Sequence, residues 1–205
     1  MTARVYLAVD PGQRGGMAAV LAGPGIEPRA AVRWAGGAHG YWRGADPRRL
    51  EIVGAAAGCI EEVLTAAGLV EGEDKAHADV PVTVGLEELI VLPGEGVRSG
   101  KTTAVGWAVL REALRDMARP LGSDPAVLRP QTWRRMVGLP RGAGKSVTIA
   151  WCARVWPAVG MVPPGGRVPS DGVADALAMA SALAGVVQAP GRATGQALGR
   201  NTDKE

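Results

Sequence analysis

Four acidic residues stand where carboxylates can act together in chemistry. Asp10 closes an apolar run at residues 4–9, and Glu87 closes another at residues 80–86. In an α/β fold, catalytic groups collect where strand ends open into loops. The other two acids, Asp171 and Asp175, are spaced i, i+4 in the segment SDGVADALAMA, so on a helix they share one face, about 6 Å apart at Cβ.

Carboxylates gathered in one pocket need a counter-charge. Four of them repel one another by several kcal/mol unless they take up protons or bind cations. Hard oxygen ligands favour Mg²⁺, with Mn²⁺ as a substitute, over zinc. Two such ions, about 4 Å apart, can activate water and stabilise the leaving oxygen when a phosphodiester is cut. The acids therefore predict a metal-dependent nuclease with two ions in each active site.

Three of the acids also have a purely structural interpretation. Asp10 begins the sequence Asp-Pro-Gly, which makes a good turn by itself. Glu87, followed by a second glutamate, can be a polar strand end. Asp171 follows Ser170 at a predicted helix start, where an acid is favoured by the helix dipole.

Asp175 is harder to explain in structural terms. Its helix carries almost only small or apolar residues around it, which predicts a buried helix, and no Lys or Arg lies within one turn of it there. A buried carboxylate without a partner is very costly. Something outside this helix must therefore neutralise Asp175.

The charge of the chain is distributed unevenly. The net charge is +3, but residues 1–97 carry −5 and residues 98–205 carry +8, most of it from arginine. Arginine binds phosphate in a bidentate way, so the basic half suits a polyanionic partner such as DNA. Two groups are candidates for DNA contact, although either can also be solvated surface: Arg98, Ser99 and Lys101, and then Arg134, Arg135, Arg141 and Lys145.

The hydrophobic pattern predicts an α/β fold with a mixed sheet flanked by helices. Strands are expected at 4–9, 17–22, 29–34, 80–86 and 125–129. Helices are expected from an N-cap at Asp46 with Pro47 at the first position to Gly68, and at 99–118, 130–137, 144–156 and 170–187. One domain, residues 1–187, is followed by residues 188–205, which lack apolar periodicity and are expected to be a disordered tail.

The cysteines, the histidines and the lengths of the apolar runs indicate in which cellular environment the protein is expected. Cys59 and Cys152 are single cysteines on apolar stretches without ligand spacing, which favours a reducing cytoplasm, with neither zinc nor a disulfide. His39 and His77 are expected on the surface. No apolar run approaches the length of a membrane span. A soluble protein of a bacterial cell, or of one infected by phage, is the expectation.

The order of these residues resembles that of the RuvC family of Holliday junction resolvases, particularly the phage-type branch. The resemblance covers most of the chain and lies in the segments LAVDPGQRGGMAAV (7–20), VTVGLEEL (82–89), LRPQTWRRMVGL (128–139), GAGKSVTIAWCARVWP (142–157) and SDGVADALAMASAL (170–183).

The resemblance implies a ribonuclease H-like fold with five strands, and a homodimer that nicks a four-way DNA junction at two active sites. It implies that Asp10, Glu87, Asp171 and Asp175 bind the metal ions and that Lys145 lies near the scissile phosphate. The last two acids are spaced i, i+4, where cellular members more often have i, i+3. At the position of the family's junction-stacking aromatic stands Ile90 or a neighbour, and Trp107, Trp133 or a loop can substitute.

Parts of the sequence also suggest other functions. RSGKTT and GAGKS look like phosphate-binding loops, but the required first glycine is replaced by Glu95 and Leu139. An actin-like or sugar-kinase ATP-binding protein also opens with a strand, an Asp and a glycine-rich hairpin, but usually needs two lobes. A ribonuclease H-like nuclease acting on RNA or on other branched DNA stays open. A non-catalytic DNA-binding module leaves Asp175 unexplained.

Overall fold

A computed structural model describes residues 2–12, 14–36, 42–43, 46–70, 80–88, 97–118 and 124–186 of the chain. For residues 42–43, 46–47, 97–103 and 118 it describes the backbone alone. His39, His77 and the predicted tail at 188–205 lie outside the described residues.

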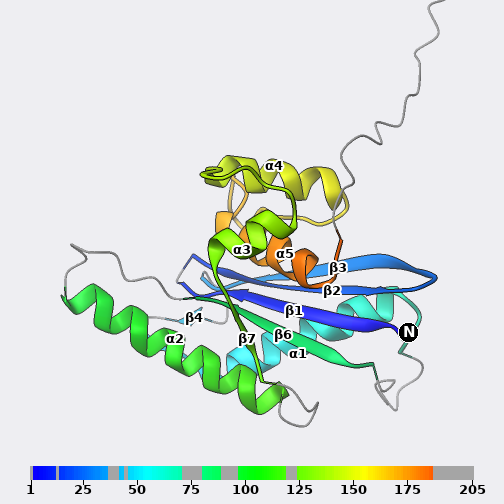
Figure 1. Cartoon of the computed structure of the whole chain (residues 1–205). Coiled ribbons are helices and arrows are strands. Elements are labelled where there is room, and N and C mark those ends of the chain that lie inside the picture. The colour runs from blue at the N-terminus through cyan, green and yellow to red at the C-terminus, as the bar shows by residue number, and fades with distance from the viewer. Residues whose placement is uncertain are drawn as a thin grey trace, which may run out of the picture.

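A five-stranded mixed sheet forms the centre of the fold (Figure 1). Its strands follow the order β3-β2-β1-β6-β7. Strand β2 runs antiparallel to both β1 and β3, whereas β6 is parallel to β1 and β7 is parallel to β6. The mixed sheet expected from the sequence is therefore confirmed. The strands are β1 (Arg4–Asp10), β2 (Gly16–Gly23), β3 (Ile26–Trp34), β6 (Val82–Glu87) and β7 (Ala126–Leu128).

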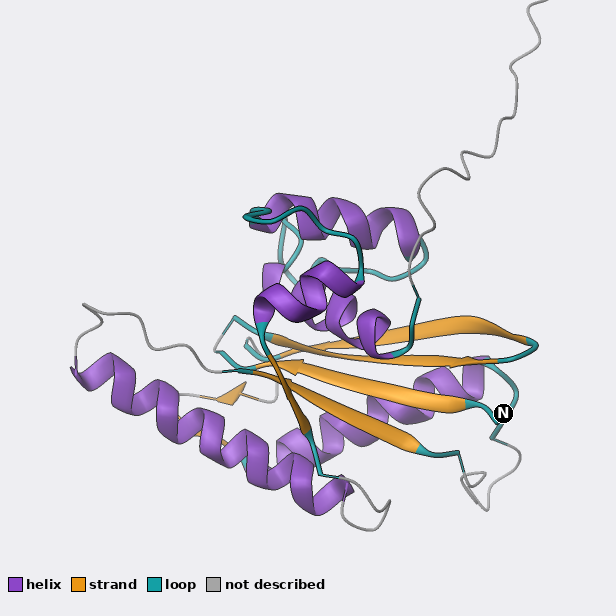
Figure 2. Cartoon of the chain, in the orientation of Figure 1, coloured by secondary structure: helices purple, strands orange, loops and turns teal. Residues whose placement is uncertain are grey.

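Helices cover both faces of this sheet (Figure 2). On one face lie α1 (Arg49–Ala66) and α2 (Val97–Ala118), and on the other lie α3 (Pro130–Met136), α4 (Lys145–Val155) and α5 (Asp171–Leu183).

The alternation along each strand decides which helices it packs against. Leu7 and Val9 of β1 point into the core under α1 and α2, whereas Ala8 points into the core under α5. Small side chains on both the sheet and α5 let this helix approach the strands closely, and α5 is buried along nearly its whole length. The helix that carries two of the candidate acids is thus held directly against the central strands.

Two element boundaries differ from the sequence prediction. Asp46 and Pro47 do not start a helix, because they form β5 (Asp46–Pro47), which pairs with β4 (Trp42–Arg43). The N-cap of α1 is instead Arg48, whose backbone is extended. Helix α5 ends at Leu183 and not near residue 187, because Gly185 adopts a positive φ of 68° just beyond its cap.

Two further expectations concern the membrane and the cysteines. None of the described helices combines the length and apolar character needed to cross a bilayer. Cys59 and Cys152, the two cysteines of the sequence, are both buried free thiols.

Candidate active site

Asp10 and Glu87 lie side by side at one end of the sheet. Strands β1 and β6 are parallel neighbours whose last paired residues are Val9 and Leu86, and Asp10 and Glu87 come one residue later on each strand. The two carboxyl groups therefore lie at the same end of adjacent central strands. Two indoles bind at Glu87: Trp133 Nε1 donates to its Oε1 at 3.0 Å, and Trp107 Nε1 donates to its backbone oxygen at 3.0 Å.

The N-terminus of α5 is packed onto the turn that follows Asp10. Gly15 and Gly172 form a β-bridge between the turn and the helix. A Cβ atom on Gly172 would lie 2.4 Å from the Arg14 oxygen and 2.8 Å from Asp10 Oδ2. Only a glycine allows this approach, which brings the first turn of α5 against the Asp10 carboxylate.

The cap of α5 fixes where the helix begins, and this sets the positions of its two acids. The Ser170 hydroxyl accepts a hydrogen bond from the Val173 amide at 3.3 Å and caps the helix. Asp171 follows in the first turn, and Asp175 lies one turn further, with a side chain that is 12% exposed. The structure thus brings all four predicted acids together, two from strand ends and two from one helix.

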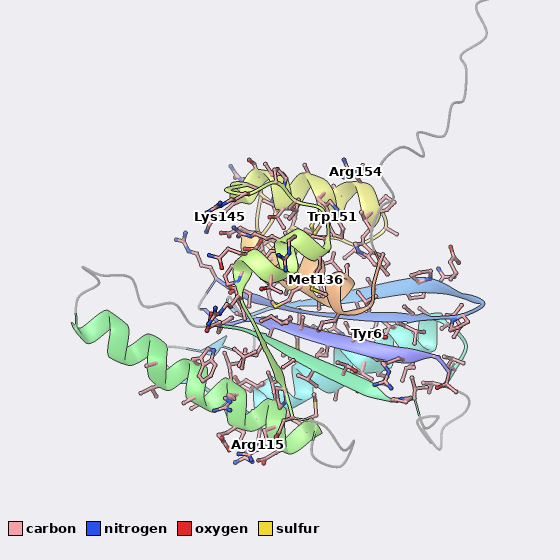
Figure 3. The ribbon with its side chains drawn as sticks, in the orientation of Figure 1. Tyr6, Arg115, Met136, Lys145, Trp151 and Arg154 are labelled. Atoms are coloured by element: carbon pink, nitrogen blue, oxygen red, sulfur yellow. The ribbon has the colours of Figure 1, made fainter. Side chains whose placement is uncertain are left out.

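Two cations reach these acids from the helices above the sheet. Lys145, the first residue of α4, forms an ion pair with Asp171 Oδ2. Figure 3 shows Lys145 at the end of α4 that lies toward the ends of the central strands. From α3, Arg134 Nη2 lies 3.5 Å from Asp175 Oδ2. The outside partner that the sequence demanded for Asp175 is therefore Arg134, in part.

The strand-end acids are destabilised in their charged forms. Burial raises the pKa of Asp10 well above its usual value, and the charges of Glu87, Asp175 and Asp171 raise it further. Burial also raises the pKa of Glu87, against the opposing effects of the Trp133 hydrogen bond and of Arg134. Both carboxylates are held where losing their charge, or gaining a cation, is favourable.

The two helix acids differ from each other. Burial raises the pKa of Asp175, and the charge of Arg134 only partly opposes this. Burial acts in the same sense on Asp171, but the hydrogen bond and charge of Lys145 outweigh it and lower the pKa of Asp171. The same contact raises the pKa of Lys145. The charged form is thus stabilised at Asp171 and destabilised at Asp175.

The chemistry of the donor set fits a divalent cation. Four carboxylates facing two cationic side chains leave two excess negative charges if all are ionised, and every available ligand atom is an oxygen. Asp175 Oδ1 is buried, and the buried Thr148 hydroxyl is the hydrogen-bond donor that favours the charged form of Asp175.

The side chains do not stand in ligand positions, however. Within the described residues no group of three or more His, Cys, Asp or Glu side chains is placed to hold a metal ion. Asp171, Asp175 and Glu87 are instead engaged by Lys145, Arg134 and Trp133. A metal ion would require these side chains to rearrange.

A basic cavity of about 410 Å³ lies beside the acids. Arg134 lines it and also contacts Asp175, so the cavity and the acidic cluster share one side chain. Arg135 and Arg141 contribute exposed guanidinium groups. The cavity is lined by Gln131, Arg134, Arg135, Leu139, Pro140, Arg141 and Gly142.

The other predicted basic group cannot be placed in the same way. Arg98, Ser99 and Lys101 belong to the first turns of α2, but their side chains lie outside the described residues. Their contact with DNA stays a prediction.

Sequence reasoning missed the contacts that α3 makes at the site. The prediction that Trp133 can substitute for the junction-stacking aromatic is wrong, because its side chain is fully buried and donates to Glu87. Trp107 is half-buried, with the Arg111 guanidinium 5.5 Å from its ring centroid. The available signal was the pair Trp133-Arg134 at one end of a short helix, but sequence does not show which way such side chains point.

No family model matches the chain, and a search of curated proteins also finds no match. A search of solved structures does find matches. RuvC of Thermus thermophilus in complex with a Holliday junction substrate is 16% identical, with 87% of this chain and 92% of that chain covered and a TM-score of 0.49.

A second T. thermophilus RuvC structure is 17% identical, with 88% and 93% covered and a TM-score of 0.46. The yeast mitochondrial Holliday junction resolvase is 12% identical, with 88% and 77% covered and a TM-score of 0.42. The structural neighbours of this chain are thus RuvC and a mitochondrial Holliday junction resolvase, all at low sequence identity.

Proposed function

We propose that this protein is a metal-dependent endonuclease that resolves four-way DNA junctions by paired phosphodiester nicks. The observation that carries the proposal is the meeting of Asp10, Glu87, Asp171 and Asp175 at one end of the central strands. Burial raises the pKa of Asp10, Glu87 and Asp175, and the neighbouring acidic charges raise it further, so a site for divalent cations gives these costly carboxylates a function.

In this proposal Asp10, Glu87, Asp171 and Asp175 hold Mg²⁺, or Mn²⁺ in its place, with two ions in each active site. The ions, when bound, supply an activated water and stabilise the leaving oxygen.

The residues of the chain itself do the rest. Trp133 fixes the Glu87 carboxylate through its hydrogen bond. Lys145 is 74% exposed at the edge of the acidic cluster, where its ammonium group can meet the scissile phosphate. The close packing of Gly15 in the turn against Gly172 in α5 holds the two strand acids and the two helix acids near one another.

The partner proposed is branched DNA, bound by a homodimer. Arg135 and Arg141 of the basic cavity are exposed next to the acids and can hold the phosphates of one strand, together with Arg134. Arg98, Ser99 and Lys101 are proposed to hold the backbone of a second region. Two nicks in opposite strands need two active sites, which a symmetric dimer provides.

The test compares a synthetic four-way junction, a linear duplex and an RNA–DNA hybrid in Mg²⁺. The variant is Asp10→Asn, which removes one proposed ligand charge. Its matched control is Glu27→Gln, an exposed acid on β3 that pairs with Arg29 far from the site. We expect nicking of the junction by the wild type and by the control, loss of nicking in Asp10→Asn, and a dimer in sedimentation analysis.

Each other outcome has a definite meaning. Junction nicking that persists in Asp10→Asn, or no Mg²⁺-dependent nicking by the wild type, would contradict the proposal. Preferred cutting of the hybrid would assign the chain to nucleases that act on RNA. Turnover of ATP in the same samples would favour the actin-like alternative.

A further inference from the structure

One arginine stands between the acidic cluster and the basic cavity. Arg134 Nη2 contacts Asp175 Oδ2 at 3.5 Å, and the same side chain lines the cavity with Arg135 and Arg141. Its guanidinium carbon lies 5.0 Å from the centroid of the Trp133 ring. A single cation thus has an acid on one side and a cavity with two further arginines on the other.

The contact between Arg134 and Asp175 is incomplete on both sides. Arg134 Nε and Asp175 Oδ1 are both buried and are not hydrogen-bonded to each other, and the Thr148 hydroxyl is the other donor that favours the charged form of Asp175. A two-pronged arginine–carboxylate pair normally satisfies such atoms with two parallel bonds. The 3.5 Å separation is longer than a good charged hydrogen bond, so the pair is held by charge more than by fitted geometry.

None of the neighbouring cations Lys145, Arg135 and Arg141 both contacts Asp175 and lines the cavity, as Arg134 does, among the described residues. Lys145 pairs with Asp171, whose side chain is 29% exposed, so solvent already screens that contact. Arg135 and Arg141 line the cavity but have no ion pair with the four acids among the described residues. Only Arg134 among the cavity arginines can therefore link an event in the cavity to the most buried helix acid.

We propose that Arg134 is an exchangeable counter-ion that makes metal binding depend on DNA. In the free protein it occupies Asp175 and lowers the affinity of the acidic cluster for a divalent cation. When a backbone phosphate enters the cavity, the guanidinium turns toward it across the Trp133 ring and leaves Asp175 free. DNA and metal then bind cooperatively, and the metal-loaded site forms mainly on DNA.

This inference rests on the proposed function, because it takes the acids as metal ligands and DNA phosphate as the occupant of the cavity. It adds to the proposed function that DNA binding promotes metal binding. If one cation serves both sites, linkage requires that DNA raise the affinity for metal by the same factor by which metal raises the affinity for DNA.

The test measures Mn²⁺ affinity by electron paramagnetic resonance of free and bound ion, without activity as the readout. The variant is Arg134→Gln, which keeps most of the side-chain shape and removes the charge. The matched control is Arg154→Gln, which removes the charge of an exposed arginine in the last turn of α4, outside the cavity and the acidic cluster. Each protein is titrated alone, and again with a four-way junction frozen before cutting, with intact strands verified on a gel.

We expect the junction to raise the Mn²⁺ affinity of the wild type about 5- to 150-fold, the usual range of coupling between two ligands. Arg134→Gln alone should bind Mn²⁺ at least about fivefold more tightly than the wild type alone, and the junction should add little. Arg154→Gln should match the wild type both alone and with the junction. Arg134→Lys, which keeps the charge, should restore part of the coupling.

Two results would overturn the inference while the proposed function stands. One is Mn²⁺ binding by Arg134→Gln that is no tighter than wild type, and the other is a wild-type affinity that the junction does not change. The second needs no variant, so it decides the question even if Arg134→Gln does not fold. If the wild type binds no Mn²⁺ with or without DNA, the proposed function fails together with this inference.

Discussion

A methyl group on Gly172 should disconnect the two halves of the candidate site. In Gly172→Ala the new Cβ would lie 2.4 Å from both the Arg14 oxygen and Gly15 Cα, which are backbone atoms that cannot rotate away. Ordinary contact begins at roughly 3.5 Å, so α5 or the turn must retreat by about 1 Å. This retreat moves Asp171 and Asp175 away from Asp10.

The size of the effect follows from that displacement. Overpacking of a tight contact costs about 1–3 kcal/mol, and the better helix propensity of alanine offsets at most about 1 kcal/mol. The net loss of stability is therefore about 0–2 kcal/mol. A misplacement of about 1 Å among catalytic groups can cost about 100-fold in rate, so activity should fall far more than stability.

The measurement pairs junction nicking with a thermal melt for two glycine-to-alanine variants. Gly54 also lies in a helix, but a Cβ there meets no atom within 4 Å. Gly54→Ala should therefore raise stability by about 0.5–1 kcal/mol and leave nicking unchanged. If Gly172→Ala gives the same two results as Gly54→Ala, the close contact does not position the acids and the reasoning is refuted.

Four further predictions follow from the same geometry. Asp10→Asn should melt higher than the wild type at neutral pH in EDTA. Since burial and neighbouring acids raise the pKa of Asp10, the folded wild type binds its proton more tightly than the unfolded chain. The advantage of the variant should therefore be full above that raised pKa, shrink as pH falls below it and vanish below the pKa of the unfolded chain; equal melting at neutral pH contradicts this. Lys145→Ala should lower kcat for nicking by about 100-fold or more with little change in junction binding in EDTA, and a selective loss of binding would assign Lys145 to DNA affinity instead. Arg141→Ala should reduce the slope of log affinity against log salt by about one, whereas an unchanged slope removes it from the phosphate contacts. Burial raises the pKa of the Cys59 and Cys152 thiols to about 12, so a disulfide reagent at pH 8 should label either one only on unfolding, and rapid labelling of the native protein would show that the cores are open.

The centre of the sheet could be predicted from the sequence because strands β1 and β6 each carry two signals. Each has an apolar run of the right length, and each ends at an acid, Asp10 or Glu87. The Asp46-Pro47 pair was misleading, since it is typical of a helix start. Local preference was overridden there by pairing with residues 42–43, which no local pattern shows.

The identity of the acids was also visible in the sequence, but their partners were not. Ser170 and Asp171 are recognisable as a cap and a first-turn acid, and the structure has both. Arg134 and Trp133 reach Asp175 and Glu87 only because α3 is packed over the carboxyl ends of the strands. Such contacts depend on the direction of side chains from a short helix, which spacing alone does not determine.

The two helix acids, Asp171 and Asp175, differ in how much they need a bound cation. Asp171, whose spacing departs from the more common pattern, has a complete explanation without metal, since it lies in a first helical turn and Lys145 lowers its pKa. Asp175 has no such explanation, because burial still raises its pKa although Arg134 and the Thr148 hydroxyl both favour its charged form. A fold under selection for stability alone would exchange this side chain for an apolar one of similar size, which is often neutral or stabilising at buried charged positions. The cost of keeping Asp175 is therefore the strongest physical argument that the cluster exists to bind a cation, and the ligand to substitute first, after Asp10, is Asp175.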